Sequence, residues 1–231
     1  RYPEVEDVCC VYMHNGKIKH EDRVYGEAQG DNADNIMLAD SNFFRFFDFK
    51  MIEGDRETAL DSPEKCVVTE SLAKALFPDG NALGQPLQIE GKRYVFVSDD
   101  NGDSYDSSLV YTVSGVIKDL DKTVLLNETA VIANFERAPQ VLGYRPRNDL
   151  MVSGPLGSTL SFLMMRPGAN LDDKIDDLTD YCTENIPMFD FSGKPRAALI
   201  PLDGLMFAPQ NNGAGLQTGD KSLLGILLAV V

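Results

Sequence analysis

The sequence predicts an α+β fold, in which single helices interrupt a larger number of short strands. Short apolar runs recur along the chain between Gly, Pro and Asn turns, as they do in proteins rich in strands. Apolar residues at helical spacing occur in only a few places. At 43% hydrophobic and 25% charged, the chain has the composition of a globular protein, and 231 residues allow one large domain or two small ones.

The N-terminal part predicts strands joined by turns. A strand from Val5 to Tyr12 follows the Pro3-Glu4 turn. Asn15-Gly16 is typical of a two-residue β-hairpin turn, so this strand is expected to pair with the next one, Lys17 to Asp22. A further short strand is expected from Ile36 to Ala39.

A phenylalanine-rich segment follows. Asp40 or Ser41 is expected to cap a short helix that contains four phenylalanines, at positions 43, 44, 46 and 47. These rings cover more than one face of a helix. Burial between two packed layers is the favoured interpretation, and an exposed aromatic patch that docks a partner is the alternative.

The middle of the chain predicts a strand, a helix and a hairpin. A strand from Lys65 to Val68 leads to Thr69, which is expected to cap a helix from Glu70 to Phe77. Pro78 ends that helix. Pro86 to Val97 is expected to form two short strands that turn at Gly91, followed by a polar loop from Ser98 to Ser108.

Leu109 to Ile117 is the clearest strand in the sequence. Tyr111, Val113 and Ile117 are expected on one of its faces, and Val110 and Val116 on the other. Because both faces are apolar, the strand is expected near the centre of its sheet.

The last part predicts three more strands and one long helix. The helix runs from Leu171 to Asn185 after the cap Asn170, with Leu171, Ile175, Leu178 and Cys182 as an apolar stripe. The strands are expected at Thr129 to Asn134, Thr159 to Arg166 and Ala197 to Leu202.

The charge restricts the partners. The formal net charge is −15, from 36 Asp and Glu against 21 Lys and Arg. Such a surface repels phosphate backbones, so nucleic-acid binding is not expected. The balance also fits the outer side of a membrane, because positive charge gathers on the cytoplasmic side.

Cysteines and histidines do not form a recognisable chemical motif. Cys9, Cys10, Cys66 and Cys182 include no C-x-x-C pair, so core positions are favoured over a redox or metal site, and any disulfide pairing stays open. His14 and His20 flank the expected hairpin turn and are interpreted as solvated surface residues. Catalytic, cofactor-binding and metal-ligating residues are therefore all expected to be absent.

Two loops resemble ligand motifs only partly. The stretch from Gly215 to Ser222 lacks the Gly-Lys pair and the preceding strand of a nucleotide-binding P-loop, so ATP hydrolysis is expected elsewhere. Asp99, Asn101 and Asp103 are spaced like calcium ligands, but Ser104 and Val110 stand where that loop needs Gly and Glu. A plain loop is the favoured interpretation, and weak cation binding is the alternative.

The last ten positions, 222–231, read Ser-Leu-Leu-Gly-Ile-Leu-Leu-Ala-Val-Val. A membrane-spanning helix needs about 20 apolar residues. This run is interpreted as the start of such a helix, with a buried C-terminal tail as the alternative.

Several segments, taken in order, resemble the extracytoplasmic domain of MacB/FtsX-like ABC transporter permeases. The most specific is the strand and helix ending in Leu-Phe-Pro, followed by Asn-Ala-Leu-Gly-Gln-Pro-Leu. The resemblance covers nearly the whole chain through Pro3–Glu6, Phe43–Asp55, Val67–Pro78, Asn81–Ile89, Tyr111–Asp119 and Gly219–Ile226.

The resemblance implies two subdomains. A porter-like βα sandwich is expected from residues 1–48 and 121–221, and a smaller, inserted sabre-like subdomain from residues 49–120. Residues 222–231 would form the start of a membrane helix or a tail. The acidic stretch between Val97 and Leu109 does not follow the family pattern.

The resemblance also implies a function. The domain would lie on the periplasmic side of the inner membrane and couple cytoplasmic ATP hydrolysis to export, lipoprotein transfer or mechanotransmission, without being an enzyme. The implied partners are an ABC ATPase subunit, a second permease copy or half, and a periplasmic adaptor or carrier protein. The alternatives are a stand-alone module that binds peptide or lipid and, less favoured, a secreted hydrolase.

Overall fold

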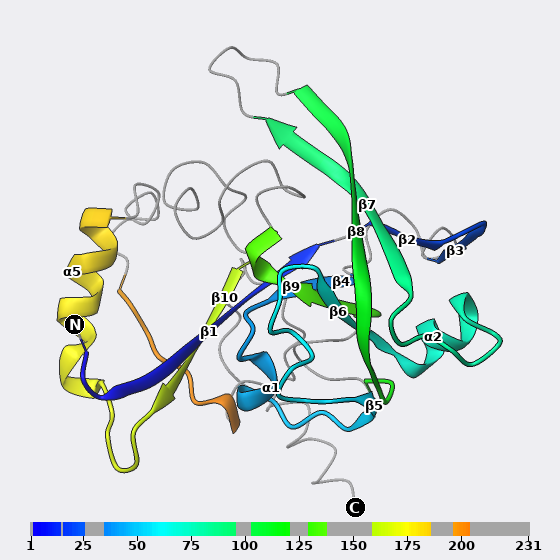
Figure 1. Cartoon of the computed structure of the whole chain (residues 1–231). Coiled ribbons are helices and arrows are strands. Elements are labelled where there is room, and N and C mark those ends of the chain that lie inside the picture. The colour runs from blue at the N-terminus through cyan, green and yellow to red at the C-terminus, as the bar shows by residue number, and fades with distance from the viewer. Residues whose placement is uncertain are drawn as a thin grey trace, which may run out of the picture.

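The computed structural model describes residues 2–14, 16–25, 35–95, 103–120, 129–137, 159–185 and 196–203. Most of its regular elements are strands, which confirms the α+β prediction (Figure 1). The strands are β1 (Val5–His14), β2 (Lys17–His20), β3 (Arg23–Tyr25), β4 (Ile36–Ala39), β5 (Met51–Gly54), β6 (Lys65–Thr69), β7 (Pro86–Val95), β8 (Asp103–Ile117), β9 (Val131–Asn134) and β10 (Thr159–Met165). The helices are α1 (Phe43–Phe46), α2 (Glu70–Leu76) and α5 (Ile175–Asn185), with short 3₁₀ turns at Phe135–Arg137 and Asp172–Lys174.

One mixed sheet contains all the described strands. Its order is β10-β1-β4-β9-β6-β8-β7-β2-β3, and β5 pairs separately with β8. The β4–β9 and β6–β8 pairs are parallel, and the other pairs are antiparallel. Leu109 to Ile117 belongs to β8, between β6 and β7, so its predicted central place is confirmed.

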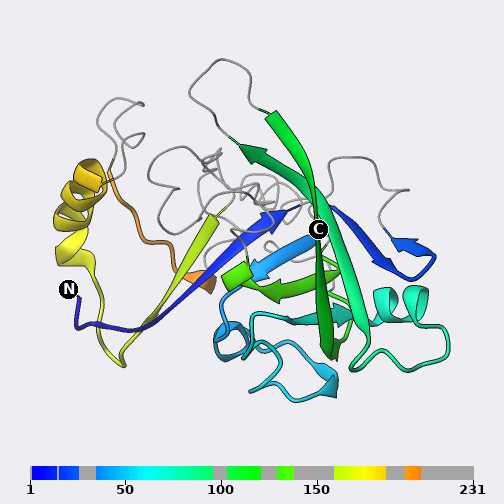
Figure 2. The ribbon, with the colours of Figure 1, turned by 45° about the horizontal axis from the view of Figure 1, so that its top comes forward.

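The sheet curves back over one of its own faces. Ile18 of β2 and Ile89 of β7 share a buried cluster with Tyr12 of β1 and Leu38 of β4, although several strands separate them in the sheet order. Leu72 and Leu76 of α2 close the same cluster. Figure 2 shows the long β7–β8 ribbon crossing over the strands of the middle of the sheet.

The phenylalanine-rich segment covers the opposite face. Phe43, Phe44 and Phe47 are buried in a second cluster with Met37 of β4 and Ile132 of β9. Burying a side chain of this size contributes about 1.5–3 kcal/mol. The buried interpretation of the segment is therefore confirmed, and an exposed aromatic patch is not what these rings form.

A bulge in β8 reverses one prediction. Cys66 pairs with Val113 but Val67 pairs with Gly115, so Ser114 is an extra residue in β8. The alternation of faces shifts by one position at such a bulge. Ile117 therefore packs in the second cluster, and not on the face of Tyr111 and Val113 as predicted, while Val116, predicted on the opposite face, packs with Tyr111 and Val113 in the first cluster.

The hairpin predicted at Asn15-Gly16 is wrong. β1 pairs with β10 and β4, whereas β2 pairs with β3 and β7. Gly16 passes so close to β7 that a Cβ on it would lie 2.3 Å from the carbonyl oxygen of Glu90. The glycine is needed for this close approach between backbones rather than for a tight turn.

The hairpin predicted at Gly91 is also wrong. β7 continues through Gly91 and pairs with β8 from Pro86↔Thr112 to Val95↔Asp103. Asp103 to Ser108 is therefore strand rather than loop. Residues 99–102, which carry most of the calcium-like pattern, lie outside the described residues.

The two predicted caps have different outcomes. Thr69 caps α2 as predicted, since its hydroxyl accepts a hydrogen bond from the N–H of Leu72. At α1 the N-cap position is Asn42, which makes no capping bond with its side chain. The carboxylate of Asp40 accepts from the N–H of Cys10 on β1 instead, so the predicted cap is wrong.

The C-terminal part is partly as predicted. Asn170 accepts a hydrogen bond from the N–H of Asp172 and begins the helical segment that leads into α5. Residues 196–201 have no regular secondary structure and Leu202 lies in a 3₁₀ turn, so the strand predicted from Ala197 to Leu202 is wrong. The strands predicted from Thr129 to Asn134 and from Thr159 to Arg166 are confirmed as β9 and β10, although β9 begins at Val131 and β10 ends at Met165.

The predicted domain boundaries and the predicted membrane helix stay predictions. The division at residues 49 and 120 is not tested, and β6 from the middle segment pairs with β9 in the common sheet. Residues 222–231 lie outside the described residues. Among the residues that are described, no helix is long and apolar enough to cross a membrane.

Candidate functional site

An arm extends from one side of the sheet. The first half of β1, Val5 to Val8, is partly exposed and has no partner strand other than β10 among the described residues. The second half pairs with β4 and enters the core. We call residues 2–8, the end of β10 from residue 163 and the segment 166–185 the arm, and the remaining described strands, including the rest of β1 and β10, with α1 and α2 the body.

Side-chain contacts hold the start of the chain to α5. The hydroxyl of Tyr2 donates to the carboxylate of Asp177, at 2.7 Å. Arg166, just after β10, donates from its N–H to the carbonyl of Glu4 and from its guanidinium to the carbonyl of Pro3. The first described residues and α5 therefore lie together at one end of the molecule, as Figures 1 and 2 both show.

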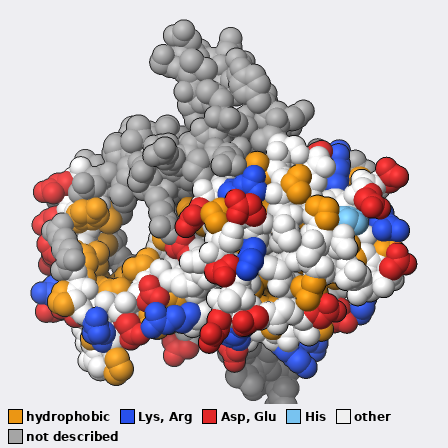
Figure 3. Space-filling model, in the orientation of Figure 1, with side chains coloured by type: hydrophobic (Ala, Val, Ile, Leu, Met, Phe, Trp, Pro, Cys, Tyr) orange, Lys and Arg blue, Asp and Glu red, His pale blue; other side chains and the backbone are white. Residues whose placement is uncertain are grey.

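The arm has apolar side chains that are only partly covered. Leu171 is buried, but Ile175, Leu178 and Cys182 of the predicted stripe are half-buried and Tyr181 is exposed. Val8 on β1 is also exposed. Figure 3 shows hydrophobic side chains around a hollow at this end of the molecule.

Arg56 fixes the phenylalanine-rich segment beneath the sheet. Its guanidinium donates to the carbonyls of Phe44 and Phe47, at 2.6 and 2.8 Å, and pairs with Asp48. These carbonyls belong to α1 and the residue after it, where backbone acceptors lack partners within the helix. One side chain thus satisfies several acceptors at the end of α1.

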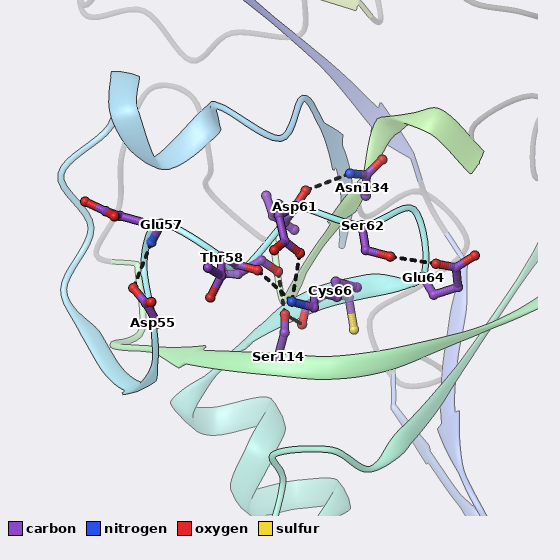
Figure 4. Close-up of polar contacts among 12 residues, drawn as sticks. Asp55, Glu57, Thr58, Asp61, Ser62, Glu64, Cys66, Ser114 and Asn134 are labelled. Carbon is purple, nitrogen blue, oxygen red and sulfur yellow. Dashed lines mark hydrogen bonds and ion pairs between the residues drawn. The ribbon is translucent and has the colours of Figure 1, made fainter.

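A second polar network anchors the loop between β5 and β6 (Figure 4). The amide of Asn134, at the end of β9, is buried and donates to the carbonyl of Leu60 at 2.8 Å, while its oxygen accepts from the N–H of Glu136. The hydroxyl of Ser114 lies within hydrogen-bonding distance of the carbonyls of Ala59 and Cys66. Side chains of β8 and β9 therefore fix the loop over the second cluster.

Surface contacts complete this loop. Lys65 donates to the carbonyl of Thr58 at 3.0 Å and pairs with Asp61 at 2.7 Å. Ser62 donates to Glu64, and this hydrogen bond lowers the pKa of the Glu64 carboxyl. Such exposed ion pairs contribute about 0–1 kcal/mol each, so the buried amide is the stronger anchor.

The two histidines differ in burial and in hydrogen bonding. His14 was predicted on the surface, but it is buried in the body, and burial lowers its pKa to about 4. Its Nε2 has no hydrogen-bond partner among the residues that the structure describes. His20 is partly buried, with its Nδ1 2.8 Å from the carbonyl oxygen of Pro86 and its ring against Phe77.

All four cysteines are free thiols. Cys9 and Cys66 are buried as predicted, and burial raises the pKa of both, that of Cys9 to about 12. Cys10 and Cys182 are half-buried. Among the described residues, no three His, Cys, Asp or Glu side chains are grouped so that they could hold a metal ion.

The residues that organise these networks were not predicted from the sequence. Asn134 is a single amide at the end of an apolar strand. This position could have predicted a buried side chain that hydrogen-bonds to a neighbouring segment. Arg56 and Ser114 gave no signal, because their partners are backbone carbonyls brought near by the fold. The contact between Tyr2 and Asp177 depends on tertiary structure alone.

Comparisons with known proteins agree with this architecture. The family model described as "MacB-like periplasmic core domain" matches residues 2–181. No curated protein matches the chain.

Three solved structures are similar to the chain. A domain assigned to a permease protein from Porphyromonas gingivalis is 20% identical, with a TM-score of 0.50, 80% of this chain covered and 73% of that one. The extracellular domain of the noncanonical ABC-type transporter YknZ from Gram-positive bacteria is 11% identical, with a TM-score of 0.50 and coverages of 79% and 77%. The periplasmic region of MacB from Actinobacillus actinomycetemcomitans is 13% identical, with a TM-score of 0.47 and coverages of 80% and 69%. At these identities the first two likenesses concern the fold alone.

Proposed function

Because the chain belongs to the MacB-like periplasmic core domain family, we propose that it transmits movement from the membrane helices of an ABC transporter permease to partners outside the cytoplasm. Members of this family are periplasmic domains of such permeases, which work with ABC ATPases. The proposed mechanism is displacement of a packed domain rather than bond-making. Its output would be export, lipoprotein transfer or activation of a partner by mechanical transmission.

The arm is the observation that carries this proposal. A domain that is moved from its end needs a part that receives the displacement and a packed part that follows it. The contacts of Tyr2 with Asp177 and of Arg166 with Pro3 and Glu4 join the first described residues to α5. β1 then continues from the arm into the buried core.

The body has the packing that transmission requires. Its two clusters lie on opposite faces of the same central strands, so β4 and β9 are covered on both sides. Close-packed interiors deform little and pass on strain. Asn134 and Arg56 additionally fix the loop and the helix that cover the second cluster.

The proposed partners follow from the family. They are an ABC ATPase, reached through the membrane part of the permease, and a second permease copy or half. A periplasmic adaptor or carrier protein would receive the movement, and the partly covered apolar side chains of the arm and the net charge of −15 would influence which one binds. The proposed location is the periplasmic side of the inner membrane.

The full-length gene product, reconstituted in lipid nanodiscs with its ATPase, tests the proposal. A donor fluorophore on α2, at Ala75→Cys, would report the distance to acceptor lipids in the outer leaflet. The proposal predicts that ATP binding changes this distance and that hydrolysis restores it. A distance that is the same with and without ATP would support the alternative of a stand-alone binding module.

A further inference from the structure

Within the part of the chain that the structure describes, no strand covers the edge of β1 on the side of α1 at the point where the arm meets the body. β4 pairs with β1 from Val11 to His14 and ends at Ala39. The next two residues of β1 that present backbone groups to this side are Cys10 and Val8. Both backbone groups of Cys10 meet Asp40, and the carbonyl of Val8 meets Asn42.

Side chains make most of the hydrogen bonds that a neighbouring strand would make to this edge of β1. The carboxylate of Asp40 accepts from the N–H of Cys10 at 2.8 Å, and the N–H of Asp40 donates to the carbonyl of Cys10 at 3.1 Å. Asn42 donates its amide to the carbonyl of Val8 at 3.0 Å. The N–H of Val8 donates to the carboxylate of Asp7 at 2.9 Å.

Arg45 links the two sides of this edge. From α1 it pairs with Asp7 at 2.8 Å and with Glu6 at 2.5 Å, so it contacts the carboxylate that also accepts from Val8. Glu6 and Asp7 lie in the arm, whereas Arg45 lies in the body. We call Glu6, Asp7, Asp40, Asn42 and Arg45 the polar bracket.

We propose that the polar bracket is the joint that makes the arm and the body move together. This inference rests on the proposed function, because a joint matters only if the arm is displaced. On the other side of β1 a β-ladder does cross this point, because β10 pairs with β1 from Val5↔Met165 to Tyr12↔Thr159 and Phe162 of β10 packs against Phe47. On the α1 side a few side-chain contacts are the described connection, and they set the angle of the two-stranded β1–β10 ribbon relative to the body. Each of these contacts is exposed or partly exposed and weak by itself, so removing two of them lets the β1–β10 ribbon bend relative to the body without unfolding the body.

The alternative for these contacts is a purely local role in satisfying the backbone of β1. The two roles predict different behaviour for parts of the molecule that lie far from the bracket. A local role affects only exchange of the Val8 amide, whereas a joint also controls the position of α5 relative to α2.

The experiment uses the 231-residue chain in a background with Cys10→Ser and Cys182→Ser. Spin labels at Glu184→Cys on α5 and Ala75→Cys on α2, both exposed positions, report the distance between arm and body by pulsed electron resonance. The inference predicts one narrow distance distribution in this background. In the variant N42A/R45A it predicts a distribution at least about twice as wide, because the arm then samples several positions.

Hydrogen exchange in the same variants checks the local consequence. Exchange of the Val8 amide is expected to accelerate about tenfold in N42A/R45A, and that of Cys10, which Asp40 holds, is expected to stay unchanged. Lys74→Ala, which breaks an exposed ion pair with Glu70 on α2, is the matched control and should alter neither measurement.

An unchanged distance distribution in N42A/R45A would overturn the joint, even if the Val8 amide exchanged faster. This result is separate from the test of the proposed function. If ATP moves the body relative to the membrane but the bracket variant behaves like its background, the joint is wrong and the proposed function stands. If ATP does not move the body relative to the membrane, and the bracket variant still broadens the distance distribution, the joint stands and the proposed function is wrong.

Discussion

The hydroxyl of Tyr2 and the carboxylate of Asp177 are joined by a 2.7 Å hydrogen bond across 175 positions of sequence. This contact places the first described residues against the last long helix that the structure describes. β1 then connects this end of the molecule with the core between its two hydrophobic clusters.

Asn134→Ala is expected to destabilise the body by about 1–3 kcal/mol, because the carbonyl of Leu60 and the N–H of Glu136 lose their buried partner. Urea unfolding followed by circular dichroism measures this change. Ser62→Ala removes a surface hydrogen bond of the same loop and should stay within about 0.5 kcal/mol of the wild type. Equal effects of the two substitutions would refute the anchoring role of Asn134.

Arg56→Ala and Arg56→Lys are both expected to destabilise the protein, by about 1–3 kcal/mol. Lysine keeps the charge but cannot reproduce the planar set of donors that reaches Phe44 and Phe47. Thermal unfolding of the two variants measures the effect. Arg196→Ala, which breaks an exposed ion pair with Asp176, is the control, and full rescue by lysine would show that only the charge matters.

His14 is expected to make the protein less stable as the pH falls. Burial lowers its pKa to about 4, whereas an unfolded histidine has a pKa near 6.5. Between these values the unfolded state binds more protons, so stability is retained above about pH 6.5 and decreases as the pH falls through this window.

The matched variant for this effect is His14→Leu, which has no titrating group at this position. From pH 7 to pH 5 its free energy of unfolding should improve relative to the wild type by about 2 kcal/mol. Urea unfolding at both pH values gives this difference. A difference independent of pH would mean that the ring of His14 is protonated as easily in the folded state as in the unfolded one.

Cys9 and Cys66 are expected to resist alkylation in the folded protein, because both are buried and burial raises the pKa of each thiol. Cys10 and Cys182, which are half-buried, should react first with iodoacetamide. Mass spectrometry of digested samples, with and without urea, assigns the order. Early modification of Cys66 in the absence of urea would contradict the packing of the first cluster.

Local patterns predicted the elements whose partners are near in sequence. Thr69 and Leu72 lie in one turn, so capping chemistry was enough to place the start of α2. The strands β4 and β9 were predicted from their apolar runs, because strands that are covered on both faces are apolar throughout.

Long-range pairing was not predictable in this way. Asn15-Gly16 has the local signature of a hairpin, but the approach of Gly16 to Glu90 on a distant strand decides its conformation. The bulge at Ser114 shifted Ile117 to the other face of the sheet. The hydroxyl of Ser114 donates to carbonyls that lie about fifty positions earlier in the sequence. The arm, the anchors Arg56 and Asn134, and the polar bracket depend on such tertiary contacts.

Movement of the domain relative to the membrane is the central claim, and the distance from α2 to the outer leaflet measures it most directly. In the reconstituted permease with its ATPase, the account predicts that energy transfer from a donor at Ala75→Cys to acceptor lipids changes when ATP binds. The change should disappear when the ATPase is inactivated. Energy transfer that does not respond to ATP in an actively hydrolysing complex would contradict the account.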